Sequence, residues 1–247
     1  AASDVYKRQI LELRQQYGFR IHADAAYGGY FGLAAEIDAE TRAALAAMTE
    51  VDSIVVDPHK HGLQPYGCGC VLFRDPSVGT LYKHDSPYTY FSSGDLHLGE
   101  ITLECSRAGA SAVALWATHQ LLPPVQGGEF ANGLDASLRA ARALWNNLDG
   151  SAAYTPLCVP ELDIVVYAVN AATASESSRR ARNIFDAAAR QELHLALIEL
   201  PVEFVRHYAP QLEADSDFVT CLRSTLMKPE HEEWLGKITA LLEASAG

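Results

Sequence analysis

Two stretches of the chain decide its expected fold: IHADAAYGG, residues 21–29, and DSIVVDPHK, residues 52–60. The first places Asp24 at the end of a short apolar run, and the second places Lys60 just beyond a β-branched run, so each predicts a strand followed by a polar side chain. The alanine- and glutamate-rich segment 34–49 lies between them and predicts a helix. A strand, a crossover helix and a second strand form a parallel pair, and ligands bind outside the carboxyl ends of such strands. Asp24 and Lys60 are therefore expected at the same edge of one sheet.

The alternation of helices and strands continues along the chain, which is typical of an α/β protein. Residues 81–99 have no hydrophobic period, and a loop of that length in a compact domain is usually functional. The pair Gly127-Gly128 is expected to mark a domain junction. The two strands of the parallel pair are expected over 19–23 and 51–56, and the other elements are a helix over 10–17, a strand over 67–73, helices over 108–122 and 130–148, a strand over 163–169, a helix over 175–190, strands over 195–200 and 218–226, and a helix over 230–244.

The composition is that of an ordinary globular protein. Of the 247 residues, 49% are hydrophobic and 20% are charged, which are typical values. The net charge of −12 argues against a nucleic-acid partner, because phosphate binding requires clustered Lys and Arg. No run of eighteen apolar residues suggests a membrane span. The five cysteines are odd in number and scattered, and no secretory signal opens the chain, so the reducing cytoplasm is the expected location.

A carboxylate and an amine at one sheet edge have a specific chemical use. The amine of a lysine forms a Schiff base with an aldehyde cofactor, and a carboxylate keeps a pyridine nitrogen protonated. A protonated pyridine draws electrons from the substrate Cα, so Lys60 and Asp24 together suit pyridoxal 5'-phosphate. Small residues such as Ala25 and Ala26 leave room for a flat ring against the strand. His59, next to the lysine, can donate to the phosphate.

Three segments carry a resemblance to a known family. They are HADAAYGGYFGL (22–33), DSIVVDPHKHGLQPYGCGCVLFRDP (52–76) and ECSRAGASAVALWATHQLLP (104–123). They resemble the pyridoxal-phosphate-dependent group II amino-acid decarboxylases, which include the aromatic-amino-acid, glutamate and tyrosine/aspartate decarboxylases and are related to sphingosine-phosphate lyase. A lone His-Lys pair would be weak evidence. Three blocks in the family's order and at similar spacing are highly specific.

The resemblance implies an α/β protein with the aspartate-aminotransferase-type fold (fold type I). Residues 1–128 would be the C-terminal part of the large domain that binds the cofactor, and residues 129–247 would be the small α+β domain. The resemblance also implies a homodimer with its active site at the subunit interface, and decarboxylation of an L-amino acid to the corresponding amine.

The resemblance further implies a role for particular residues. Lys60 would form the Schiff base, Asp24 would pair with the pyridine nitrogen, Ala26 would pack on the ring and His59 would touch the phosphate. No metal is implied. Ser106 matches a family serine that reaches the phosphate from the partner subunit.

The same comparison points to an acid in the long loop. Asp85-Ser86-Pro87-Tyr88 falls where the family has a mobile loop tyrosine that protonates Cα after carbon dioxide leaves. Tyr88 is therefore the candidate acid, with Tyr90 as its competitor. Ser106 keeps a purely structural alternative, the start of a helix.

Simpler interpretations of these residues stay open at this point. Lys60 could be a surface lysine after a strand, and Asp24 could be a helix N-cap. The pairs His59/His61 and Cys68/Cys70 suggest a metal cluster, but they lack the usual zinc spacing. The cysteines are expected to pack as small apolar residues.

Two alternatives also remain for the function. A carbon–carbon lyase of the sphingosine-phosphate lyase type shares the motifs and the cofactor. The other alternative is a catalytically incomplete fragment, because the family's N-terminal half, with a glycine- and serine-rich phosphate loop and a histidine stacked on the ring, is not found in this sequence. His22 precedes the aspartate motif and cannot replace that histidine.

Overall fold

The computed structural model describes residues 4–83, 100–101 and 108–247. Two of the predicted site residues, Tyr88 and Ser106, lie outside this range. The chain forms two compact units. Unit 1 consists of residues 1–34 and 38–131, and unit 2 of residues 35–37 and 132–247.

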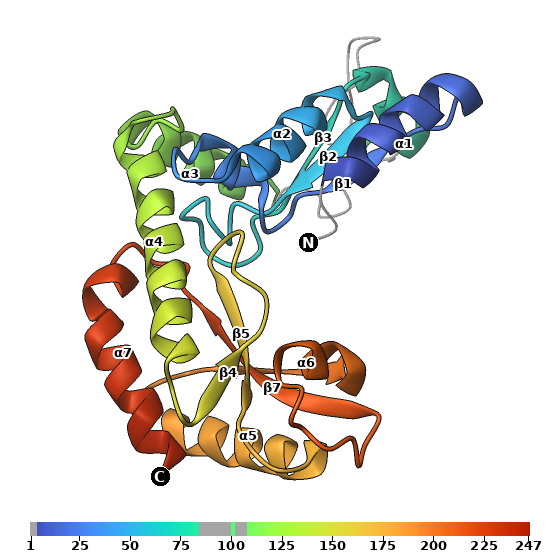
Figure 1. Ribbon diagram of the computed structural model, residues 1–247. Helices are drawn as coiled ribbons and strands as arrows, with labels where there is room; N and C mark the ends of the chain where they lie inside the picture. The colour runs from blue at the N-terminus through green and yellow to red at the C-terminus, as the bar shows by residue number, and fades with distance from the viewer. Residues whose placement is uncertain (1–3, 84–99, 102–107) are drawn as a thin grey trace. The chain divides into compact units, whose positions relative to one another are not determined.

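Unit 1 is built on a three-stranded sheet with the order β1-β2-β3 (Figure 1). Its strands are β1 (His22–Asp24), β2 (Ser53–Val56) and β3 (Cys70–Phe73). The first two are parallel, which confirms the predicted pair. The third, for which the sequence predicted a strand but no direction, runs antiparallel to β2, so the sheet is mixed. The connection between β2 and β3, residues 57–69, contains no helix, whereas parallel strands are usually joined by a crossover helix.

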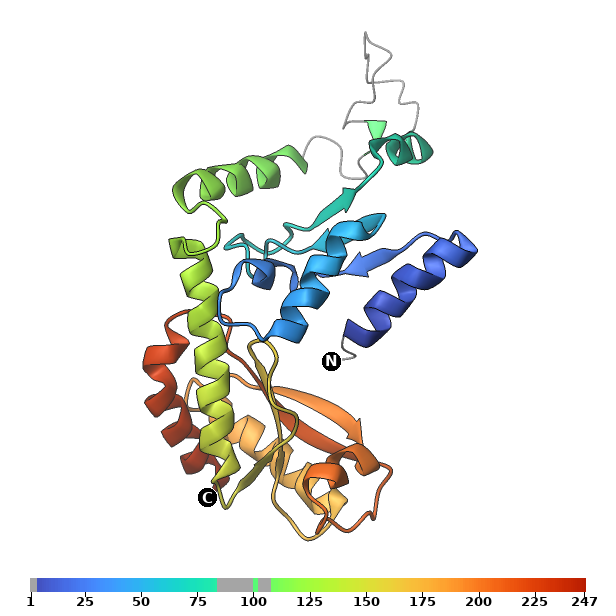
Figure 2. The ribbon, with the colours of Figure 1, turned by 45° about the horizontal axis from the view of Figure 1, so that its top comes forward.

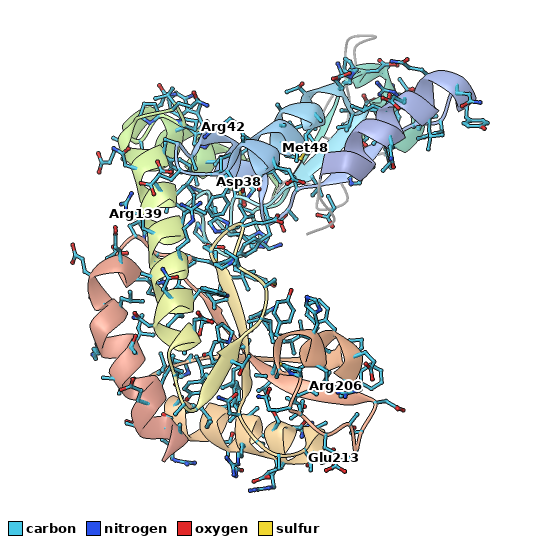
Figure 3. All side chains as sticks on the ribbon, in the orientation of Figure 1. Asp38, Arg42, Met48, Arg139, Arg206 and Glu213 are labelled. Atoms are coloured by element: carbon cyan, nitrogen blue, oxygen red, sulfur yellow. The ribbon has the colours of Figure 1, made fainter. Side chains whose placement is uncertain are left out.

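The three predicted helices of unit 1 are present, but α1 begins six residues before its predicted start. They are α1 (Asp4–Tyr17), α2 (Ala39–Ala47) and α3 (Ala108–Leu121), with the 3-10 helices η1 (Gly29–Leu33), η2 (Met48–Glu50) and η3 (Pro76–Tyr82). The helix predicted from residue 34 begins later, because Asp38, labelled in Figure 3, caps it. One Asp38 carboxylate oxygen accepts a 2.8 Å hydrogen bond from the backbone N–H of Thr41, and the other accepts a 2.6 Å bond from its hydroxyl. An N-cap of this kind fixes where a helix starts.

Unit 2 contains a four-stranded antiparallel sheet with the order β4-β5-β7-β6. Figures 1 and 2 both show α4 and α7 side by side. The predicted elements of this region are confirmed to within one or two residues. The elements of unit 2 are α4 (Glu129–Asp149, which begins in unit 1), β4 (Tyr154–Pro156), β5 (Ile164–Val169), α5 (Ala174–Ala189), β6 (Ala196–Pro201), α6 (Val202–Tyr208), β7 (Phe218–Thr225) and α7 (His231–Ala246).

The core of unit 2 lies on both faces of this sheet. On one face, residues of α4, α5 and α7 pack with Tyr167 and Leu222 of the two central strands. On the other face, residues of α6 pack with Ala168, Val219 and Cys221. The alternation of faces along β5 and β7 follows from the two-residue period of a strand. Both strands are therefore covered on both sides.

One ion-pair cluster lies at the edge of unit 2. The Arg139 guanidinium, labelled in Figure 3, contacts Glu36 and Glu232, with N–O distances of 2.5 and 2.6 Å. Side-chain hydrogen bonds to Arg139 lower the pKa of the Glu232 carboxyl. All three side chains are about 40% exposed, and Arg139 holds both carboxylate oxygens of Glu232, at 2.6 and 2.9 Å, which is the bidentate geometry in which a surface ion pair contributes to stability. None of the helices in the described part of the chain is long and apolar enough to cross a membrane.

Candidate cofactor site

The ends of β1 and β2 stay together beyond the last residues of the strands. Asp24, the last residue of β1, lies opposite Val55. The Ala25 N–H donates to the Val55 carbonyl at 3.0 Å, and the Asp57 N–H donates to the Ala26 carbonyl at 3.1 Å. These bonds carry the parallel pairing past both strands. The structure therefore brings the Asp24–Ala26 segment next to the start of the loop that bears Lys60.

The Lys60 loop is tightly folded. The Lys60 N–H donates to the Asp57 carbonyl at 2.9 Å, and the His59 N–H donates to the Cys68 carbonyl at 3.1 Å, which closes the loop. A side chain at Gly62 would have no room, because a β-carbon there would lie 2.6 Å from Pro58 Cα. The loop thus holds Lys60 at a fixed distance from the end of β2.

Lys60 is paired with a residue that sequence reasoning missed. Its Nζ lies 2.9 Å from Oδ2 of Asp57. The same oxygen lies 3.7 Å from Nε2 of His59, whose Nδ1 lies 2.8 Å from the Cys68 carbonyl oxygen. A carbonyl oxygen only accepts hydrogen bonds, so Nδ1 of His59 carries the hydrogen. The only signal for Asp57 in the sequence is its spacing of three residues from Lys60.

Asp24 is exposed and has a local partner. Its Oδ1 accepts a 3.1 Å hydrogen bond from the Ala26 N–H. It is not a helix N-cap, since the next helix, η1, begins at Gly29 with Gly28 as its N-cap. Within the described residues, no hydrogen bond or ion pair joins Asp24 to Lys60. A carboxylate with one local partner is free to accept a further hydrogen bond from a ligand.

Asp24 also borders a pocket of about 250 Å³ in unit 1. His22 lines the same pocket, and its Nδ1 lies 2.8 Å from the Ser53 hydroxyl. The rest of the lining is apolar and comes from β1, α1, α2 and the residues that follow α2, including Met48, which Figure 3 labels. Asp24 is therefore the acidic group of a largely apolar hollow.

Aromatic side chains pack against His61. The His61 ring is buried and lies edge-on to Tyr27 and Phe31, with ring centroids 4.6 and 4.8 Å apart. Burial, with nearby cysteines as smaller causes, raises the pKa of Tyr30 to about 12. Tyr27 and Phe31 thus hold the ring of His61, the residue that follows Lys60 in the loop.

The cysteines of this region are held as thiols. Burial is the main cause that raises the pKa of Cys68 and Cys70, which keeps both protonated near neutral pH. In the part of the chain that the structure covers, no group of three or more His, Cys, Asp and Glu side chains could hold a metal ion.

The donor set fits pyridoxal 5'-phosphate. An amine whose side chain is 33% exposed, an exposed carboxylate on the neighbouring parallel strand and an imidazole next to the amine are the groups that an aldehyde, a pyridine nitrogen and a phosphate need. The two residues that follow Asp24 are alanines, and Ala25 is buried. Fold and side chains together define the class of protein. It is an α/β protein in which a lysine and an aspartate follow the carboxyl ends of two paired parallel strands, as a site for pyridoxal 5'-phosphate requires.

Comparison with known proteins supports the same class. Residues 5–166 match the pyridoxal-dependent decarboxylase conserved domain. Because that match covers more than half of the chain, the chain belongs to the pyridoxal-dependent decarboxylase family. Pyridoxal 5'-phosphate is the cofactor of this family of carboxy-lyases.

Curated relatives and solved structures agree with this family. The chain is 31% identical over 169 residues to the L-tyrosine decarboxylase of Enterococcus faecium, which covers 54% of this chain and 27% of that protein. It is 36% identical over 110 residues to a probable L-tyrosine/L-aspartate decarboxylase of Methanothermobacter thermautotrophicus, covering 44% of this chain and 29% of that protein. The fold is similar to that of a Lactobacillus brevis glutamate decarboxylase, with a TM-score of 0.71 and 16% identity over 97% of this chain and 49% of that one. The chain therefore has the predicted fold type I architecture, and it spans less than a third of these curated relatives.

Proposed function

We propose that this chain carries the lysine-bearing part of the active site of an enzyme that decarboxylates an L-amino acid to its amine. The observation that carries the proposal is the placement of Lys60 and Asp24 at the same end of the parallel strands β1 and β2. Bound pyridoxal 5'-phosphate supplies the electron sink that accepts the electron pair left when the carboxylate departs as carbon dioxide.

Each described site residue has a task in this proposal. Lys60 holds the cofactor covalently through Nζ. Asp24 keeps a proton on the pyridine nitrogen, and the methyl group of Ala26 packs against the ring. His59 faces the phosphate with Nε2, which donates when the ring is doubly protonated, because the Nδ1 hydrogen is already bonded to the Cys68 carbonyl. Orientation is the main work of such a site, since the bond that breaks must lie perpendicular to the ring.

The proposal extends to the organisation of the protein. Residues 1–128 would be the later part of the cofactor-binding large domain, and residues 129–247 the small domain. The protein would act in the cytoplasm as a homodimer, in which Ser106 reaches the phosphate bound by the partner subunit. The relatives named for tyrosine and aspartate decarboxylation support an amino acid as the substrate. Measuring carbon dioxide against aldehyde release would separate a decarboxylase from a carbon–carbon lyase.

Reduction with borohydride in the presence of pyridoxal 5'-phosphate tests the proposal directly. We expect peptide mapping to place the pyridoxyl group on Lys60, because its amine is the one held at the strand ends. Lys60→Arg keeps the charge and should abolish that label. A label found on Lys83 or Lys228 in place of Lys60 would refute the assignment.

Tyr88→Phe tests the proposed proton donor, which lies outside the described residues. The substitution keeps the ring and removes the phenol proton that would reach Cα. We expect carbon dioxide release to continue while amine formation falls, with aldehyde and ammonia as diverted products. Both products should be measured in the same reaction. Amine formed at the normal ratio to carbon dioxide would exclude Tyr88, and Tyr90→Phe would be tested next.

A further inference from the structure

Asp57 occupies a special place in the Lys60 loop. It is the first residue after β2, and its backbone N–H is fixed on the Ala26 carbonyl at 3.1 Å. Its side chain is only 17% exposed. A β-carbon on Gly69 would lie 3.4 Å from Oδ1, so that oxygen faces the residue that precedes β3. The carboxylate is therefore held by the loop and is not a mobile surface group.

The other carboxylate oxygen faces both polar groups of the Pro58-His59-Lys60 turn. Oδ2 lies 2.9 Å from Lys60 Nζ and 3.7 Å from His59 Nε2. The Asp57 charge extends further into the loop, since it is the second cause, after burial, that raises the pKa of the Cys68 thiol. One partly buried negative charge is thus in contact with the lysine and near the histidine.

We propose that Asp57 is a positioning residue that holds Lys60 as an ion-paired ammonium at the strand end until the lysine bonds to the cofactor. The role at the cofactor step rests on the proposed function; the ion pair itself does not. An ammonium in an ion pair has no free electron pair with which to attack a carbonyl carbon. Asp57 therefore restrains Lys60 in the cofactor-free protein, and it acts through Lys60 without touching the cofactor.

The sharing of Oδ2 gives the carboxylate a second neighbour. When Lys60 turns away toward the cofactor, Oδ2 loses its contact at 2.9 Å and keeps His59 Nε2 nearby. The fixed Nδ1 contact to the Cys68 carbonyl holds the imidazole ring in place during this exchange. Nε2 offers Oδ2 a hydrogen only when the ring is doubly protonated, so releasing Lys60 leaves the partly buried Asp57 carboxylate without its 2.9 Å partner, which favours the ion-paired lysine in the cofactor-free protein.

Competitive reductive methylation of the cofactor-free protein tests the inference. Formaldehyde and dimethylamine borane are uncharged, so a change of local charge does not alter their approach. Asp57→Asn keeps the size of the side chain and removes its charge. We expect the methylation rate of Lys60 to rise about fivefold, the upper range for a partly exposed ion pair, relative to the exposed Lys228 and Lys237.

The second described lysine ion pair of unit 1 supplies a matched control. Lys83 Nζ lies 3.0 Å from Glu100 Oε1. Glu100→Gln should raise the rate at Lys83 and leave Lys60 unchanged, and Asp57→Asn should do the reverse. An unchanged Lys60 rate in Asp57→Asn would overturn the inference. A rise at all lysines together would also overturn it, because it would mean a structural role in folding.

The unsubstituted protein offers a measurement that does not depend on a variant. In 1 M salt, where charges are screened within about 3 Å, the Lys60 rate should rise relative to Lys228. No rise would count against an ion-paired lysine. Pyridoxyl labelling of Lys60 in the same preparation reports separately on the proposed function. Labelling without the Asp57 effect refutes only the inference, and the Asp57 effect without labelling refutes only the proposed function.

Discussion

Asp24→Asn is expected to lower the decarboxylation rate by about 10²- to 10³-fold, the loss typical of removing one electrostatic contact to a developing charge. The asparagine keeps the shape and the hydrogen bond to the Ala26 N–H, but it does not hold a proton on the pyridine nitrogen. Lys60 should still become labelled with pyridoxal 5'-phosphate and borohydride. Initial rates of carbon dioxide release, measured on protein with matched labelling, give the result.

Asp75→Asn is the control for this prediction. Asp75 also accepts a hydrogen bond from the backbone N–H two residues later, at 2.9 Å from Ser77, as Asp24 does from Ala26 at 3.1 Å. Both substitutions therefore remove a carboxylate charge that accepts a hydrogen bond from the backbone N–H two residues later; Asp75 in addition caps η3. Full activity in Asp24→Asn, or equal losses in both variants, would show that the charge of Asp24 has no part in the chemistry.

Leu222→Ala is expected to destabilise unit 2 by about 3 kcal/mol, within the range for a buried leucine that leaves a cavity. Leu222 is fully buried, and it lies opposite Tyr167 of β5 and Leu197 of β6. The loss should appear as a lower denaturant midpoint for the unit 2 transition, with an unchanged slope.

The same strand provides the comparison. Phe218 is 55% exposed, and Phe218→Ala should cost less than about 1 kcal/mol, as exposed substitutions usually do. Similar losses in the two variants would mean that burial does not control the stability of β7. A loss below 1 kcal/mol in Leu222→Ala would contradict the central place of this residue in the core.

The long elements could be predicted because their signals are local. The helix expected over 175–190 is α5 (Ala174–Ala189), which begins where the Thr173 hydroxyl accepts a hydrogen bond from the Glu176 N–H. The strand β4 and the helix α6 were missed, because three and seven residues are too few to show a period. The strand β4 is held by contacts distant in sequence, such as the 2.7 Å hydrogen bond from the Tyr154 hydroxyl to the Leu242 carbonyl.

The residues of the candidate site also differ in whether they could be predicted from local sequence. Asp24 and Lys60 could be proposed from sequence because each follows a recognisable strand. Asp57 could not, since its contact with Lys60 depends on a turn that is closed by the carbonyl of Cys68, nine residues beyond His59. The antiparallel direction of β3 was hidden for the same reason. Strand direction depends on how the connecting loop closes. Residues 57–69 contain no helix that would indicate a crossover to a parallel strand.

The Cys68 carbonyl accepts from His59 twice, from the backbone N–H at 3.1 Å and from the ring at 2.8 Å. Every amino acid brings the same main-chain oxygen, so selection acting on this contact does not act on the thiol. Position 68 should therefore accept other small side chains during evolution, and they must be small because the Cys68 side chain is buried. Position 57 has no such freedom if its carboxylate serves as inferred, because only its side chain supplies the charge. Substitutions should therefore be tolerated at position 68 and removed by selection at position 57.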